Sequence, residues 1–328
     1  MACGSEKTAL RSREEETGAT KDGPDTMIAV VNVAFNVVAP IFLVVGLAAL
    51  VTHRYKPDPG TLSSLTTYLF SPCLVLDGMA NSDLRADEIG QLIALVLLLA
   101  IVLAGIGWGL FRLLGFDRRL ESAFLLTVVL ANAGNYGLPL NEFAFGEAGL
   151  QRATVFFVAS ALVVNTVGVF LASRGSVPVR QSLLNVLKVP LGYAMALGLL
   201  LNFAGVTLPL PMQRTVAVLG QAAVPGMLAV LGMQLARVSV KGQVGPMLLA
   251  TGLRLILAPA LAFGLALLLG LGGVARQVAV VEAGTPAAVF GTVLATEFGS
   301  DAEFTTAVIM VSTLASLVTL SVLLVIVG

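Results

Sequence analysis

The residues best placed to do chemistry lie in two apolar stretches that glycine, proline and polar side chains interrupt. The first stretch reads LANAGNYGLPLNEFAFG, residues 130–146, and it contains Gly134, Gly137 and Pro139. Proline removes a backbone donor and glycine lowers helix stability, so this spacing predicts a broken helix. Asn132 and Asn135 lie beside the predicted break and offer amide groups to a polar ligand.

The second stretch repeats this pattern later in the chain. It reads VEAGTPAAVFG, residues 281–291, and Gly284 and Pro286 supply the predicted break. Glu282 and Thr285 lie beside it. A single proline kink in a membrane helix usually serves packing alone, whereas two matched breaks indicate a binding site.

A pair of broken helices offers a defined chemistry to a ligand. The N-terminus of a half-helix presents unpaired N–H groups and a partial positive charge, which suits a carboxylate. Unwound carbonyls and the asparagine side chains suit a cation or a ligand that bears hydroxyl groups. Backbone groups freed inside a membrane must be satisfied by protein, water or a ligand.

Three further polar residues lie inside apolar sequence. A carboxylate within a membrane is costly and marks a functional site, so Glu282 is expected either to take up a proton or to bind Na⁺ with oxygens of Asn132 and Asn135. Arg254 has three roles open to it: holding a substrate carboxylate, neutralising Glu282, or extending to the membrane surface. Asn165 either lines the site or joins helices.

Composition places these stretches in a lipid environment. The chain is 57% hydrophobic and 12% charged, with a mean hydropathy of +0.95, whereas soluble domains carry about 25% charged residues. The formal net charge is zero, so nucleic acid is not an expected partner. One histidine and two cysteines leave little for a metal centre or a histidine-dependent catalytic triad, and no cofactor is expected.

The elements that must position the polar residues are predicted membrane helices of about 20 apolar residues each. We predict ten spans near residues 28–51, 61–80, 89–113, 122–145, 152–172, 182–203, 213–235, 245–270, 275–297 and 303–327. Residues 1–26 are polar and predicted to be a disordered tail, with Met27 as a second candidate start. Residues 27–175 and 176–328 then form two five-helix units.

Loop charges predict an orientation for these spans. The loops after spans 1, 3, 5 and 7 hold nine Lys and Arg residues, against four in the opposite loops. The positive-inside rule therefore predicts that both termini lie outside the cell.

The two units share short motifs in the same order. The pairs include Ala133-Gly134 with Ala283-Gly284, and Phe145-Gly146 with Phe298-Gly299. A unit of five spans is odd in number, so the second copy must enter the membrane from the opposite side. Inverted repeats of this kind are typical of secondary transporters.

The run NAGNYGLPL followed by FGEAGL, and the later EAGTPAAVF and STLASLVTL, resemble the auxin efflux carrier family of permeases. The resemblance implies ten spans in two inverted halves, a fold shared with bile-acid sodium symporters. Members export auxin in plants and move malate, malonate or similar carboxylates in bacteria. The chain lacks the long central loop of the plant carriers, so it looks like a bacterial type, and auxin itself is not the expected substrate.

These observations predict an all-α membrane protein that is a secondary transporter of small organic anions, malate-like carboxylates above all, across the plasma membrane. The expected substrate-binding residues are Asn132, Gly134, Asn135, Gly137, Pro139, Asn165, Arg254, Gly284, Thr285 and Pro286. The expected coupling-ion residues are Glu282, Asn132 and Asn135, with Na⁺ or H⁺ as the ion. The alternatives are a coupled symporter of another amphipathic anion, a channel, or an intramembrane enzyme, and a homodimer stays open.

Overall fold

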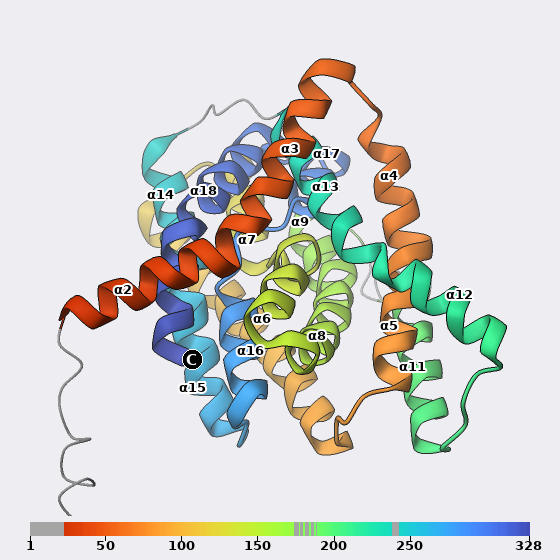
Figure 1. Ribbon diagram of the computed structural model, residues 1–328. Coiled ribbons are helices and arrows are strands. Elements are labelled where there is room, and N and C mark those ends of the chain that lie inside the picture. Colours follow the sequence, from red (N-terminus) through yellow and green to blue (C-terminus); the bar gives the residue numbers. More distant parts are fainter. Residues whose placement is uncertain are drawn as a thin grey trace, which may run out of the picture.

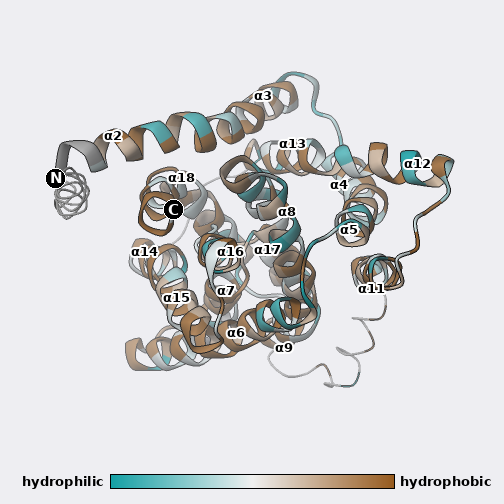
Figure 2. Cartoon of the chain, turned by 60° about the horizontal axis from the view of Figure 1, so that its bottom comes forward, coloured by the Kyte–Doolittle hydropathy of each residue, from teal (hydrophilic) through white to brown (hydrophobic). Residues whose placement is uncertain are grey.

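The computed structural model describes residues 23–173, 189–237 and 243–328, with positions 177, 180, 184 and 187 between the first two ranges. Every regular element in these residues is a helix, and the sole strand-like feature is an isolated antiparallel bridge between Ala131 and Ala287. Hydrophobic residues cover most of the helices (Figure 2). Within the described residues, six helices are long and apolar enough to cross a membrane. The predicted all-helical class is therefore confirmed.

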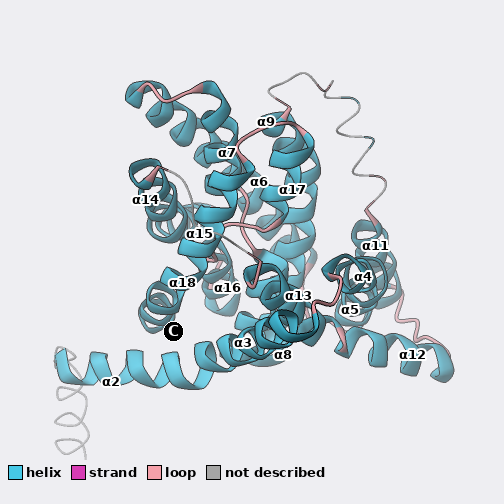
Figure 3. Ribbon diagram, turned by 90° about the horizontal axis from the view of Figure 1, so that it is seen from above, coloured by secondary structure: helices cyan, strands magenta, loops and turns pink. Residues whose placement is uncertain are grey.

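One group of helices lies at the side of the molecule, and we call it the peripheral layer. Its elements are α2 (Gly23–Val33), η2 (Ala34–Val38), α3 (Ala39–Tyr55), α4 (Pro59–Leu65), η3 (Thr66–Phe70), α5 (Ser71–Ala80), α11 (Pro190–Phe203), α12 (Leu210–Gln221) and α13 (Ala223–Leu235). Helix α3 packs on α13, and α5 packs on α11 and α12 (Figures 1 and 3). Helix α2 begins inside the predicted tail, whose residues 1–22 lie outside the described part.

The remaining helices form a second group, the core bundle. Its elements are α6 (Ala86–Leu114), α7 (Arg118–Val129), η4 (Ala133–Gly137), α8 (Leu138–Val163), η5 (Val164–Gly168), α9 (Val169–Ala172), α14 (Val244–Gly252), η6 (Leu253–Leu257), α15 (Ala258–Leu268), α16 (Gly273–Ala283), α17 (Phe290–Glu297) and α18 (Ala302–Val327). The largest hydrophobic cluster lies mostly among these helices and extends to α5 and α11 of the peripheral layer. Residues of α7 and α16 belong to it.

Two glycines end helices in conformations that other residues rarely adopt. Gly146 interrupts α8 with φ +64°, and Gly299 follows α17 with φ +68°. A side chain at such a φ clashes with its own backbone, so glycine is the residue that fits. Both belong to the Phe-Gly pairs that the sequence comparison of the two units matched.

The start of α4 is fixed by a charged cap outside the membrane-length helices. The carboxylate of Asp58 accepts hydrogen bonds from the backbone N–H groups of Gly60 and Thr61 and from the Thr61 hydroxyl. The Thr61 side chain, followed by these amides, lowers the pKa of Asp58 below its ordinary value. This cap sets where α4 begins.

Candidate functional site

Two interrupted helices cross in the core bundle. Helix α7 ends at Val129 and η4 begins at Ala133, while α16 ends at Ala283 and α17 begins at Phe290. The N–H of Asn132 donates to the carbonyl of Pro286, and the N–H of Ala288 donates to the carbonyl of Leu130, both at 2.9 Å. The unwound segments therefore satisfy one another as a short antiparallel bridge. The first interruption lies earlier than predicted, because Pro139 sits inside α8 rather than at the break.

A serine from α18 completes the hydrogen bonding of this bridge. The N–H of Ala287 donates to Ser312 Oγ at 3.2 Å, and both residues are fully buried. Without that acceptor the N–H would be orphaned inside the bundle, at a cost of roughly 1–3 kcal/mol. The crossing is thus held by backbone and side chain together.

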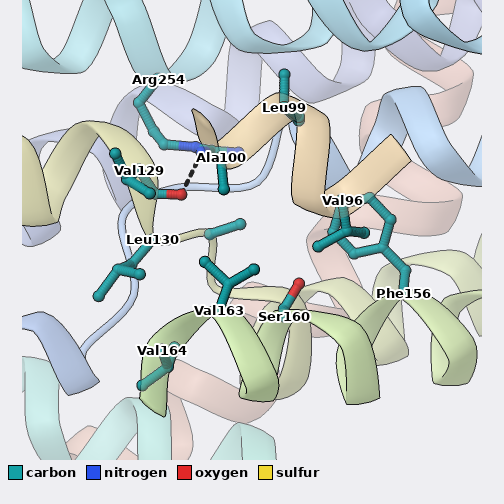
Figure 4. A pocket seen from close by; sticks show the side chains of 11 residues that line it. Val96, Leu99, Ala100, Val129, Leu130, Phe156, Ser160, Val163, Val164 and Arg254 are labelled. Atoms are coloured by element: carbon teal, nitrogen blue, oxygen red, sulfur yellow. Dashed lines mark hydrogen bonds between the residues drawn. The ribbon is translucent and has the colours of Figure 1, made fainter. Parts of the chain in front are cut away.

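The guanidinium of Arg254, on η6, closes the C-terminal ends of both interrupted helices. Its Nε donates to the carbonyl of Thr285 at 3.0 Å and its Nη1 to that of Val128 at 3.1 Å. Its Nη2 donates to the carbonyl of Ala283, and Nη1 also reaches Val129 (Figure 4). The side chain is 1% exposed, so it does not extend to a membrane surface. Its donors are directed at helix-end carbonyls, a set of partners the sequence did not reveal.

A small cavity of about 20 Å³ lies beside Arg254, and apolar side chains dominate its walls (Figure 4). This space is sufficient for about one water molecule. It is too small to hold a metabolite and is not the candidate site.

The side chain of Glu282 packs against Gly137 of η4. Its side chain is fully buried, and its Oε1 accepts a hydrogen bond from Asn141 Nδ2 at 3.1 Å. The same Nδ2 also donates to the carbonyl of Gly137 at 2.9 Å. A Cβ atom at position 137 would collide with the carboxylate, so this close approach requires glycine. Asn141, which sequence reasoning did not select, is therefore the partner of Glu282.

A large cavity of about 550 Å³ lies between the peripheral layer and the core bundle. Asn132, Gly134 and Asn135 of the crossing line it, as does Asn165 of η5. The peripheral layer contributes a row of hydroxyl side chains from α4, η3 and α5, which are Ser63, Ser64, Thr66, Thr67, Tyr68 and Ser71. The run SSLTTYLFS in the second predicted span carries this signal, and sequence reasoning missed it.

Three polar atoms in the residues around this cavity are buried and lack a hydrogen-bond partner within the described part of the chain. They are Asn132 Nδ2 from the core bundle, and Thr66 Oγ1 and Gln234 Oε1 from the peripheral layer. Leaving such groups unpaired is costly. They lie on residues from both sides of one cavity, one in the core bundle and two in the peripheral layer.

The predicted site residues thus fall into three places. Asn132, Gly134, Asn135 and Asn165 line the large cavity. Gly137 and Glu282 form the buried cluster with Asn141, and Pro139 follows in the first turn of α8. The third group consists of Pro286, whose carbonyl accepts the Asn132 N–H at the crossing, and of Gly284, Thr285 and Arg254 at the helix ends behind it.

An all-helical chain with membrane-length helices, two interrupted helices that cross, and a polar cavity beside the crossing has the features of a multi-pass membrane transporter. The chain belongs to the membrane transport protein family, whose family model matches residues 33–182 and 176–324. This is the family of the auxin efflux carriers, so the resemblance carried by the sequence motifs is confirmed.

Two archaeal proteins are similar to the chain. An uncharacterized transporter of Methanothermobacter thermautotrophicus is 28% identical over 267 residues, which cover 81% of this chain and 88% of the relative. An uncharacterized transporter of Methanocaldococcus jannaschii is 28% identical over 209 residues, which cover 62% of this chain and 68% of the relative. These similarities point to a transporter rather than an enzyme.

Proposed function

We propose that the protein is a secondary transporter of small organic anions, and that the cavity of about 550 Å³ beside the crossing is its substrate site. The proposal places it in the plasma membrane, with both termini outside, and assigns transport to alternating access between the two layers. The family membership supports the assignment as a transporter, and the lining of the cavity supports an anion as the substrate.

The observation that carries the anion assignment is the arrangement of helix N-termini. The first residues of η4, Ala133–Asn135, and of α17, with Ala288 and Val289 before it, all line the cavity. Helix N-termini carry unpaired N–H groups and a partial positive charge of about half a unit. The buried Asn132 Nδ2 adds a side-chain donor that has no partner among the described residues. These donors suit a carboxylate.

A second candidate substrate is an amphipathic monocarboxylate. No Lys, Arg or His is among the described residues that line the cavity, while Tyr68, Phe157 and Phe290 place aromatic rings there. One carboxylate can be held by the two helix N-termini, whereas a second one would face hydroxyl groups and apolar walls. This lining favours an anion with one carboxylate and an apolar body over a malate-like dicarboxylate.

We assign the coupling role to the cluster around Glu282, in place of the predicted set with Asn132 and Asn135. Glu282 Oε2 and Asn141 Oδ1 are buried acceptors that lack a donor within the described residues. Two acceptors without a donor suit either a small cation such as Na⁺ or a proton carried by the carboxyl group. Replacing Glu282 with Gln should remove any dependence of uptake on a Na⁺ or proton gradient.

Ten spans in two inverted halves remain part of the proposal. The matched glycines Gly146 and Gly299, with φ +64° and +68°, support it because each follows an interrupted helix. The antiparallel pairing of Ala131 with Ala287 supports it further, since inverted copies bring their broken segments together head to tail.

The test of the proposed function is uptake into proteoliposomes that contain the purified full chain. Labelled malate, malonate and an aromatic monocarboxylate such as phenylacetate are offered in turn, with and without Na⁺ and proton gradients. We expect saturable uptake of at least one of these acids, and the monocarboxylate to be preferred. If none of the acids moves under any gradient, the proposed function is wrong.

A further inference from the structure

Arg254 is the one described side chain that bonds the ends of both interrupted helices. Through Val128 it reaches the end of α7, and through Ala283 and Thr285 it reaches the end of α16. Arginine can do this because its guanidinium is a rigid planar fork of N–H donors, which a lysine ammonium does not reproduce. We propose that Arg254 is a positioning residue that fixes how the two helices cross.

Arg254 reinforces a small set of hydrogen bonds at the crossing of the two interrupted helices. Within the described residues, the other hydrogen bonds at the crossing include the backbone bonds from Asn132 to Pro286 and from Ala288 to Leu130, the bond from Asn141 Nδ2 to Glu282 Oε1, and the bond from the Ala287 N–H to Ser312 of α18. Hydrogen bonds from a charged donor are about twice as strong as neutral ones. The guanidinium therefore adds charge-assisted ties between the ends of the two interrupted helices.

The positive charge of Arg254 also complements the helix dipoles at the crossing. Helices α7 and α16 turn their C-terminal, partially negative ends toward the guanidinium, and these ends offset part of its positive charge. The following half-helices turn their positive N-termini toward the large cavity. A buried charge without such partners would be strongly destabilising, so the guanidinium and the helix ends stabilise one another.

The positioning role of Arg254 goes beyond the proposed function, because it concerns how the two helices cross and does not depend on a substrate. Hydrogen exchange measured by mass spectrometry on the full chain in detergent micelles reads the crossing directly. In Arg254→Gln, peptides that contain the Asn132 and Ala288 amides should both exchange at least about tenfold faster than in the wild type. The matched control is Arg276→Gln, whose guanidinium lies over the Phe263 ring and away from the crossing, and it should exchange as the wild type does.

A change confined to η6 and its neighbouring helices, or no change at all, would overturn the proposal. If Arg254→Gln is not recovered folded, Arg254→Lys serves instead. It keeps the charge and loses the fork, so both peptides should exchange faster than in the wild type.

A disulfide across the crossing separates a positioning role from a general loss of stability. Ala131 and Ala287 form the non-hydrogen-bonded kind of antiparallel pair, whose Cα atoms are typically about 4.5 Å apart, within disulfide range. Ala131→Cys with Ala287→Cys is introduced into Arg254→Gln, in a chain with Cys3→Ala and Cys73→Ala. Oxidation should return exchange at both peptides to within about twofold of the wild type, as expected when a cross-link replaces a lost tie. Exchange that stays fast after the disulfide has formed would show that Arg254 acts elsewhere.

Discussion

At the scale of single residues, spacing on a helix separates the two polar clusters. Gly137 and Asn141 are four residues apart, so they share one face of the helix and meet Glu282 there. Asn132 and Asn135 lie before this pair and line the large cavity instead. Residue types and spacing in the sequence predicted one site that includes Gly137, Glu282, Asn132 and Asn135, whereas helical geometry distributes these residues over two places.

Gly137 is the residue whose replacement should report most clearly on the buried cluster. In Gly137→Ala the added methyl group meets the Glu282 carboxylate, and overpacking of this kind costs about 1–3 kcal/mol. Thermal unfolding in detergent should show a lower midpoint. Gly105→Ala on α6 is the control, since its Cβ would meet no atom within 4 Å. Equal midpoints for the two variants would contradict the close approach of Glu282.

At the scale of elements, four prolines of this chain change the hydrogen-bonding pattern of a helix without ending it. The π-turns η2, η3, η4 and η6 are each followed, two residues after their last residue, by Pro40, Pro72, Pro139 and Pro259 respectively. In each case the residue before the proline donates to the carbonyl five positions back. The wider π-turn accommodates the proline ring and the absence of the proline N–H, so the helix continues.

This explains which part of the site the sequence could locate. The presence of a broken helix near Pro139 was predictable, since glycine and proline are local signals. The position of the break was not predictable. The carbonyls of Leu130 and Val128 accept hydrogen bonds from the Ala288 N–H and the Arg254 guanidinium, which lie far along the chain. At Pro286 the proline lies within the unwound segment itself, and there the local prediction is confirmed.

The crossing should depend on Ser312 more than on a comparable serine of the same helix. Ser312→Ala leaves the N–H of Ala287 without an acceptor, and we expect a loss of about 1–3 kcal/mol in the free energy of unfolding. Ser321 is also buried on α18, but its Oγ donates to the Leu317 carbonyl of its own helix. Ser321→Ala should therefore change stability little. Chemical denaturation in mixed micelles compares the two, and similar losses would argue against the bridge.

At the scale of the whole molecule, the peripheral layer and the core bundle meet around the large cavity. Apolar length predicted many helices well, as the expected span 303–327 and the observed α18 (Ala302–Val327) show. The layers were not predictable, because the packing of α3 on α13 and of α5 on α11 joins segments far apart in the chain. Only the fold therefore reveals that the hydroxyl side chains of η3 line the same cavity as Asn132.

A ligand that lies between the layers should couple residues on its two sides. Asn132 belongs to the core bundle and Gln234 to the peripheral layer, and each carries a buried polar atom that has no hydrogen-bond partner in the described part of the chain. We expect Asn132→Ala and Gln234→Leu each to lower kcat/KM for uptake, and the double variant to lose less than the product of the two effects. Strictly multiplicative losses would indicate that no single ligand touches both residues.

The most direct test of the central claim is uptake by Asn132→Ala, in proteoliposomes, of an acid that the wild-type protein transports. Asn36→Ala is the control, because Asn36 is an exposed asparagine whose amide bonds Asn32 of its own helix. We predict that kcat/KM falls at least about tenfold in Asn132→Ala, as expected for loss of a donor to a charged ligand, and stays at the wild-type value in Asn36→Ala. Wild-type kinetics in Asn132→Ala would contradict the assignment of the substrate to the cavity at the crossing.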